Sequence, residues 1–117
     1  MKWIEGRSSN PNAPYFKMKI FESNLFKFDI YILKYPTGSF ISPHIDPCPK
    51  GYNHNRVNVI IKKGLGGIFH IRENNVDYPN RRRVIKFRPD IQEHWVSRVI
   101  LETRYVLSIG WLTSVKE

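Results

Sequence analysis

Proline or glycine interrupts nearly every window of this chain that is long enough to hold a helix. Eight prolines and seven glycines are spread over 117 residues, and we find no convincing amphipathic helix with apolar residues at a 3.6-residue period. Only residues 21–26 could form a helical turn or two. The sequence therefore predicts very little helix.

Short runs rich in β-branched and aromatic residues recur instead. In the clearest run, Phe26, Phe28, Ile30 and Ile32 alternate with polar residues, which is the period of a strand with one buried face. Further strands are expected at 16–21, 40–46, 56–62, 67–71, 83–88, 94–100 and 104–112. About eight short strands at fairly even spacing, separated by turn-forming residues, predict an all-β sandwich or barrel.

Length and composition limit the classes of protein that remain. With 117 residues and 41% hydrophobic content, residues 1–117 are expected to form a single domain with one core. The sequence has neither an apolar run of the length that a membrane span needs nor the apolar start of a signal peptide, so we expect a soluble, cytoplasmic protein without a membrane partner. Cys48 is the single cysteine, which excludes an internal disulfide and a zinc site built from paired cysteines.

The charge is strongly positive. Nineteen Lys and Arg against ten Asp and Glu give a formal net charge of +9, which favours anionic partners such as nucleic acid, an acidic surface or a small carboxylate, or only keeps a small protein soluble. The most basic run contains Arg81, Arg82, Arg83, Lys86 and Arg88. This run either binds a phosphate backbone or is the charged edge of a hairpin, which prevents pairing with other strands. The sequence does not decide between these two interpretations.

A candidate metal site begins at His44 and Asp46. Residues two apart on a strand project from the same face, so the imidazole and the carboxylate can bind one ion together. His94, at the start of a later strand, supplies a third ligand, and two histidines with one carboxylate form the facial triad of non-haem Fe(II) oxygenases. The alternative is that His44 is a turn residue and His94 a hydrogen-bonded core residue. His54 and His70 have no second metal-ligating residue at a suitable spacing and are interpreted as surface or loop residues. Cys48 is interpreted as a small residue that fills space in the packing near the site.

Arg104 strengthens the metal hypothesis. On a strand Arg104, Val106 and Ser108 share one face, so a guanidinium and a hydroxyl would point inward together. A buried arginine without an acidic residue on its own face requires an anion, and its planar fork matches a carboxylate. A dicarboxylic acid is therefore a natural ligand.

These motifs also occur in the order found in a known family. The chain resembles the Fe(II)- and 2-oxoglutarate-dependent dioxygenases, most closely the small prolyl-4-hydroxylase-like branch, over residues 31–112. The motifs that carry the resemblance are Tyr35-Pro36-x-Gly38, His44-x-Asp46, Arg56 with Gly66-Gly67 behind it, His94-x-Val96, and Thr103-Arg104-Tyr105 ending in Gly110-Trp111-Leu112.

The resemblance implies a double-stranded β-helix, a jelly-roll or cupin-like fold. It implies iron on His44, Asp46 and His94, with 2-oxoglutarate chelating the iron and Arg104, Tyr35 and Ser108 binding the cosubstrate. The implied reaction uses O₂ to hydroxylate a C–H bond, such as that of a prolyl side chain on a protein or peptide, while 2-oxoglutarate becomes succinate and CO₂; ascorbate is a further cofactor that it allows. The alternatives are a nucleic-acid-modifying oxygenase of the same superfamily and a non-catalytic basic β-barrel that binds nucleic acid or protein.

The N-terminal helices that usually brace the outer sheet in this family are missing or reduced. We expect residues 1–24 to cover the outer face instead, through Trp3, Ile4, Tyr15, Phe16 and Phe21, with residues 25–113 as the catalytic core. If they do not, the protein could be a homodimer rather than a monomer, with the second copy as the cover.

Overall fold

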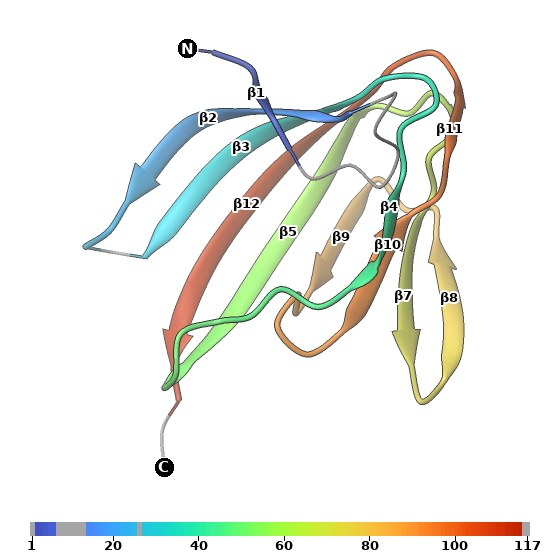
Figure 1. Cartoon of the computed structure of the whole chain (residues 1–117). Coiled ribbons are helices and arrows are strands. Elements are labelled where there is room, and N and C mark those ends of the chain that lie inside the picture. The colour runs from blue at the N-terminus through green and yellow to red at the C-terminus, as the bar shows by residue number, and fades with distance from the viewer. Residues whose placement is uncertain (1, 7–13, 26, 116–117) are drawn as a thin grey trace.

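The computed structural model describes residues 2–6, 14–25 and 27–115, which form strands joined by turns and loops (Figure 1). The strands are β1 (Ile4–Glu5), β2 (Phe16–Ser23), β3 (Phe28–Tyr35), β4 (Ile41–His44), β5 (Tyr52–Lys62), β6 (Leu65–Gly66), β7 (Phe69–Glu73), β8 (Val76–Asn80), β9 (Val84–Phe87), β10 (Glu93–Val96), β11 (Val99–Leu101) and β12 (Arg104–Ser114). Within these ranges there is no helix, and so none that could cross a bilayer. The prediction of an all-β protein with little helix is confirmed.

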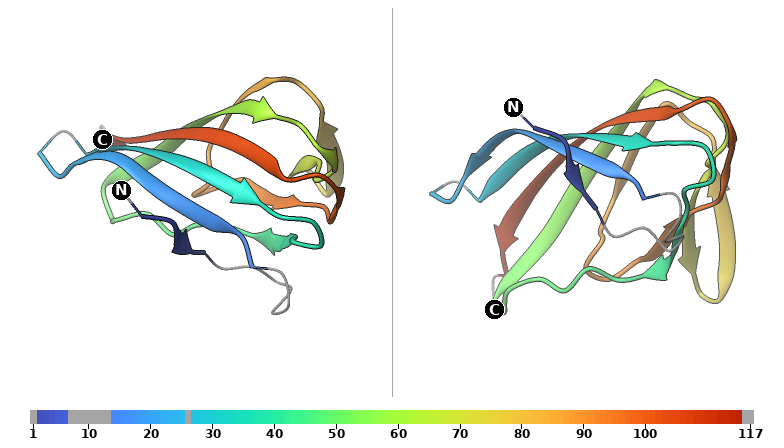
Figure 2. Two further views of the ribbon diagram at one scale, coloured as in Figure 1. Left: turned by 90° about the horizontal axis from the view of Figure 1, so that it is seen from above. Right: turned by 45° about the horizontal axis from the view of Figure 1, so that its top comes forward.

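Two sheets face each other, and all strand pairs are antiparallel. The larger has the order β1-β2-β3-β12-β5-β9 and the smaller the order β4-β10-β7-β8, with β11 and β6 forming a separate pair. Figure 2 shows the large sheet curving around one side of the small one. The space between the inner faces of the two sheets holds both the core and the candidate site.

The predicted strands are present, with several differences in detail. The run 94–100 divides into β10 and β11, and the short strands β1 and β6 were not expected. The segment 74–80, which looks like a loop in sequence, is a hairpin turn followed by β8. Asn74 and Asn75 make this turn with φ of 51° and 63°, a conformation that asparagine tolerates and that matches the twist of a hairpin. Residues 21–23 lie in β2 and not in a helical turn.

The hydrophobic core lies against the candidate metal site. It comprises Tyr35, Phe69, Ile71, Ile85, Phe87, Val96, Val99 and Val106. The rings of Phe69 and Phe87 are 4.8 Å apart, and Phe87 lies 5.1 Å from the ring of His94. Packing of the core therefore fixes the position of one of the predicted ligands.

Strand β3 turns its polar face to the interior, whereas its alternating pattern suggests that the apolar face would be buried. Asp29, Tyr31 and Tyr35 line the cavity between the sheets, whereas Ile30 and Ile32 are paired with outward residues of β12. The interior can accept this polar face because it is a ligand cavity and not a packed core at this point. The apolar face of β3 is left on the outside of the large sheet.

The N-terminal segment does not cover that outside face. Strands β1 and β2 lie within the large sheet and extend it beyond β3. Tyr15 is stacked on Tyr35, with ring centroids 5.1 Å apart, and both rings line the inner cavity. Backbone pairing thus places the described part of residues 1–24 at the edge of the large sheet and not across its outer face, with the ring of Trp3 5.5 Å from Nζ of Lys34. Residues 1 and 7–13 lie outside the described residues.

Candidate metal centre

Strand pairing brings the two predicted histidine ligands together. His44 ends β4 and is the register partner of His94 in β10, and their rings are 4.3 Å apart between centroids. Asp46 follows just beyond the end of β4, where its backbone N–H donates to the carbonyl of Pro89 at 2.8 Å. The 49 residues of chain between the first and third ligands are thus closed into a loop by one antiparallel pair.

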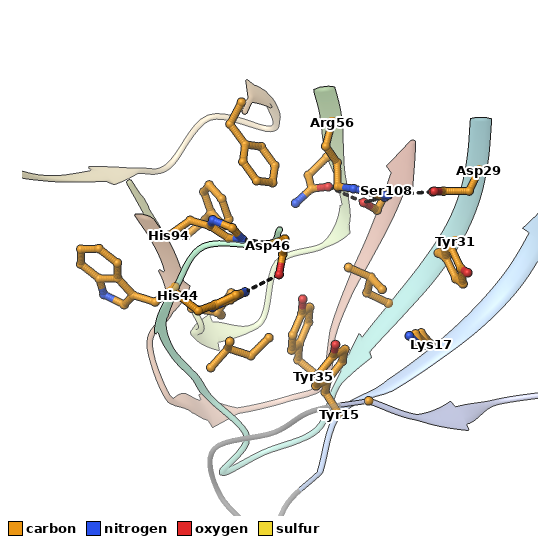
Figure 3. A pocket seen from close by; sticks show the side chains of 18 of the residues that line it. Tyr15, Lys17, Asp29, Tyr31, Tyr35, His44, Asp46, Arg56, His94 and Ser108 are labelled. Carbon is orange, nitrogen blue, oxygen red and sulfur yellow. Dashed lines mark hydrogen bonds and ion pairs between the residues drawn. The ribbon is translucent and has the colours of Figure 1, made fainter. Parts of the chain in front are cut away.

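The three side chains converge on one point (Figure 3). Nε2 of His44 lies 3.4 Å from Oδ1 of Asp46, and Nε2 of His94 lies 3.3 Å from Oδ2. One ligand atom from each residue lies within 4.8 Å of the others, and this is the group of potential metal ligands found among the described residues. The structure therefore brings His44, Asp46 and His94 together in a group able to hold a metal ion.

Backbone hydrogen bonds set the tautomer of both histidines. Nδ1 of His44 is 2.8 Å from the carbonyl of Ser42, and Nδ1 of His94 is 2.8 Å from the carbonyl of Gln92. A carbonyl oxygen can only accept, so Nδ1 carries the proton in each ring. Both Nε2 atoms face Asp46 across the site, where each can offer its lone pair to a metal ion, and the second hydrogen bond at Nδ1 has the role usual at a metal-binding histidine.

The carboxylate is charged at neutral pH. Burial favours the protonated form of Asp46, but a hydrogen bond from His94 and the electrostatic effect of the His94 and His44 rings lower its pKa below the ordinary 3.8. A metal ion would meet an ionised oxygen donor without having to displace a proton.

The metal group lies at one wall of a cavity of about 430 Å³. The opposite wall is the inner face of the large sheet, including Tyr31, Asn58 and Ser108. A second hollow of about 450 Å³ is also lined by Asp29 and His54 and adds Pro47, Cys48 and Tyr52. The site is therefore open to a ligand larger than a small acid.

Arg56 lines this cavity, as Lys17 also does. Its Nη1 donates to Ser108 Oγ at 2.7 Å, and its Nη2 forms an ion pair with Asp29 at 2.8 Å. Ser108 in turn donates to Asn58 Oδ1 at 2.7 Å. The guanidinium lies close to Gly110, where an added Cβ would be 2.2 Å from Nη2. The sequence places Arg56 at a strand start, but its partner Asp29 was not expected, since contacts between distant strands are invisible in a linear pattern.

Arg104 occupies a different position from Arg56. It is 4% exposed on the inner side of β12, and its Nε has no hydrogen-bond partner among the described residues. It is not among the residues that line the cavity, although Tyr35 is. Gly67, with φ of 60°, leaves room for it, because an added Cβ there would be 3.1 Å from Arg104 Cδ. A buried guanidinium nitrogen without a partner is the arrangement expected of a site for an anion.

Tyr35 links Arg104 to the cavity. Burial raises the pKa of Tyr35, and this outweighs the opposing effect of the positive charge of Arg104. Burial also lowers the pKa of Arg104, but arginine remains protonated in proteins. Tyr35 is thus a neutral phenol that can donate a hydrogen bond into the cavity.

Two histidines interpreted as surface or loop residues lie in strands. His54 in β5 is half-buried and lines both hollows, and burial lowers its pKa, which keeps it neutral. His70 in β7 is stacked on Trp95 with ring centroids 5.0 Å apart and is 2.9 Å from Asp77. Strand β5 begins earlier than its sequence pattern suggests, which is why His54 was missed. Cys48 is half-buried and donates to the carbonyl of Tyr52 at 3.4 Å between Sγ and oxygen.

The basic run is divided by the fold. Arg88 donates to Asp90 through Nε and Nη2 and to the carbonyl of His54. Arg83 donates to the carbonyl of Ile60, and Lys86 lies over the ring of Trp111 at 5.8 Å. Arg81 and Arg82 are exposed at the end of the β7–β8 hairpin. The five cations therefore do not form one continuous surface, and contact with a polyanion remains a prediction.

Comparison with known proteins gives the fold. No protein-family model matches the sequence, and no curated protein matches it. A prolyl-4-hydroxylase from Pseudomonas putida matches the structure with a TM-score of 0.69 and 14% identity, over 94% of this chain and 78% of that one. A predicted oxalate decarboxylase from Thermotoga maritima matches with a TM-score of 0.62 and 17% identity, over 86% and 82%. The cupin-2 domain of a transcriptional regulator from Enterobacter cloacae matches with a TM-score of 0.57 and 15% identity, over 83% and 95%.

The chain has a double-stranded β-helix fold. The fold class expected from the family resemblance is thereby confirmed. Similar double-stranded β-helices belong to enzymes and to a regulator, so an activity has to be argued from the site.

Proposed function

We propose that this protein is an Fe(II)- and 2-oxoglutarate-dependent dioxygenase that hydroxylates a C–H bond. The observation that carries the proposal is the convergence of two histidine Nε2 atoms and one carboxylate on a cavity. Two imidazoles and a carboxylate suit Fe(II) and leave coordination positions for other ligands. When bound, Fe(II) and 2-oxoglutarate would couple O₂ reduction and release of succinate and CO₂ to hydroxylation. The similarity to a prolyl-4-hydroxylase supports the proposal.

In this proposal Arg104 binds the carboxylate of 2-oxoglutarate that lies away from the metal. The unpartnered Nε and the burial of Arg104 support this role, because a charge-assisted hydrogen bond to a carboxylate satisfies such a group. Tyr35 donates its phenolic hydrogen to the same ligand. Ser108 already accepts from Arg56 and donates to Asn58, so it contributes by holding Arg56 at the cavity wall.

The substrate we propose is a protein or peptide side chain, with proline as the first candidate. The second hollow supports this choice, since its walls include Phe28, Pro47 and Tyr52 and it shares Asp29 and His54 with the main cavity. An extended peptide could lie across both hollows with one side chain directed at the metal group. A nucleic-acid substrate, suggested by the net charge of +9, and a non-catalytic binding module are the alternatives.

An anaerobic titration tests the metal and cosubstrate together. The purified protein is titrated with Fe(II) and then with 2-oxoglutarate while the visible charge-transfer band of the chelate is recorded. The band should appear in the wild type and be absent in His44→Ala, whose side chain is partly exposed and whose folding is checked by circular dichroism. Absence of the band in folded wild-type protein rejects the proposal and favours the binding module.

The substrate is tested by succinate release with ascorbate present to keep iron reduced. Proline-containing peptides and single-stranded oligonucleotides are compared at two salt concentrations. A peptide substrate should show weak dependence on salt, whereas several phosphate contacts would make affinity fall steeply as salt rises. Turnover stimulated by oligonucleotides alone would replace the peptide assignment.

A further inference from the structure

The outer face of the large sheet is more apolar than its inner face. Register pairing places Met18, Ile32, Leu107, Val59 and Val84 in one row across five strands, and Phe21, Ile30, Ile109, Val57 and Lys86 in the next. The corresponding inner row is Lys19, Tyr31, Ser108, Asn58 and Ile85. A sheet with an exposed outside normally alternates the other way, with polar residues outward.

Nothing in the described part of the chain lies over these rows. Strands β1 and β2, the expected cover, are members of the sheet, and Figure 2 shows no described segment on the outer side of β3, β12 and β5. Val84 is 56% exposed and Phe21 is 49% exposed. A contiguous apolar surface of this kind marks a site of interaction.

The positive charges around the two apolar rows are not balanced by nearby negative charges. Lys34 and Lys62 lie in a third outward row, beside the two apolar ones, together with Phe16 and Tyr105. Lys86 lies at the β9 edge. Strands β2, β3, β12, β5 and β9 contribute no carboxylate at the outward paired positions. Glu5 of β1 pairs with Phe16, at the opposite edge of the sheet from Lys86. The surface is therefore apolar in the middle and positive at its margin.

We infer that this outer face, defined by the two apolar rows and Lys34, Lys62 and Lys86, is the docking surface for an acidic amphipathic helix of a partner protein. The rows cross five strands, about 19 Å at ~4.8 Å per strand, the length of roughly three to four helical turns. Glutamate or aspartate beside the apolar stripe of such a helix would meet the lysines. The inference is independent of the catalytic proposal, because none of these side chains lines the metal cavity.

A second copy of this chain and a lipid surface fit less well. A two-fold interface would place the same lysines on both sides, and like charges that face each other destabilise a complex. Membrane binding requires apolar groups that project into the lipid, whereas Ile30, Ile32 and Leu107 are half-buried within their own sheet. A partner that brings its own apolar stripe can pack against such side chains.

The test uses three synthetic 18-residue helical peptides with the same apolar stripe, flanked by Glu, by Gln or by Lys. Binding to the full chain is measured by fluorescence anisotropy. The Glu peptide should bind most tightly and the Lys peptide least, with a difference that shrinks as salt rises. Equal binding of the three peptides, or binding of none, overturns the proposal.

Matched variants locate the peptide. Lys62→Glu with Lys86→Glu should weaken the Glu peptide by at least about fivefold, whereas Lys50→Glu with Arg81→Glu, which changes net charge equally at exposed positions elsewhere, should not. Phe21→Ser with Val84→Ser should also weaken it, and both positions are exposed enough for the fold to persist. Equal effects of the two charge pairs would overturn the assignment to this face.

The other occupants are separate arms of the experiment. Sedimentation should show a monomer, and a dimer that Phe21→Ser with Val84→Ser dissociates would assign the face to a second copy. Vesicles of phosphatidylserine and phosphatidylcholine should not compete with the Glu peptide. Binding to vesicles but to none of the peptides would replace the partner helix with a lipid surface.

Discussion

His44 and His94 are direct register partners across the β4–β10 pair, and each hydrogen-bonds its Nδ1 to a carbonyl two residues earlier in its own chain segment. The two rings are therefore oriented by the backbone before any metal arrives. Preorganisation of this kind lowers the entropic cost of binding, since the ligands need not be ordered by the ion.

This arrangement predicts one tautomer for both rings. In metal-free protein, long-range ¹H–¹⁵N NMR spectra should show a proton at Nδ1 of both His44 and His94, because the carbonyl oxygens beside these atoms can only accept. His54, whose ring makes no such bond among the described residues, serves as the internal comparison. A ring that carries no proton at Nδ1 at either ligand would contradict the geometry on which the metal site rests.

Arg104 should control affinity for 2-oxoglutarate and not for metal. Arg104→Lys keeps the charge but loses the planar fork, so the Kd for 2-oxoglutarate should rise by about 10- to 100-fold, equivalent to roughly 1.5–3 kcal/mol for hydrogen bonds to a charged group. Isothermal titration under anaerobic conditions measures this, with Fe(II) affinity as the unchanged readout. A parallel loss of Fe(II) binding would show that the variant disturbs the whole site. Arg56→Lys is measured in parallel, to test whether Arg56, which lines the cavity, binds 2-oxoglutarate instead of Arg104.

Gly110 is predicted to be required by Arg56. An added methyl group would clash with the guanidinium, so Gly110→Ala should lower the free energy of unfolding by about 1–3 kcal/mol. Urea denaturation of Gly110→Ala, Arg56→Ala and the double variant forms a cycle that isolates the contact. In the Arg56→Ala background the glycine substitution should cost much less. Additive effects would mean that Gly110 is needed for another reason.

The ion pair of Arg88 and Asp90 should make stability depend on pH in the acid range. The hydrogen bonds from Arg88 lower the pKa of Asp90 below 3.8. A carboxyl with a lowered folded pKa stabilises the fold above its unfolded pKa of about 3.9, and this contribution is lost as pH falls through the folded value.

Urea unfolding of wild type and Asp90→Asn at pH 7 down to pH 2.5 tests this dependence. The wild type should be more stable by roughly 1–3 kcal/mol at pH 7, and the difference should shrink toward the acid end as Asp90 takes up a proton. A difference that stays constant over the whole range would show that the charge of Asp90 is not what stabilises the wild type.

The sequence by itself determined the elements that depend on local chemistry. Proline and glycine exclude long helices, so an all-β chain could be predicted. Alternation along residues 104–112 placed Arg104, Val106 and Ser108 on one face, and all three are buried. The spacing of His44 and Asp46 identified them as a candidate ligand pair, although Asp46 lies just beyond the end of β4 and is held there by a backbone hydrogen bond to Pro89.

Only the tertiary structure decided which face of each strand is inside and which distant groups meet. The same alternation in residues 28–35 was interpreted with the wrong face inward, because a strand pattern shows that its faces differ but not that a cavity will prefer the polar one. The pairing of Arg56 with Asp29, and the extension of the sheet by β2, depend on backbone hydrogen bonds between segments far apart in sequence. Those bonds form with almost any side chains, and they leave no local signal by which sequence alone could have placed them.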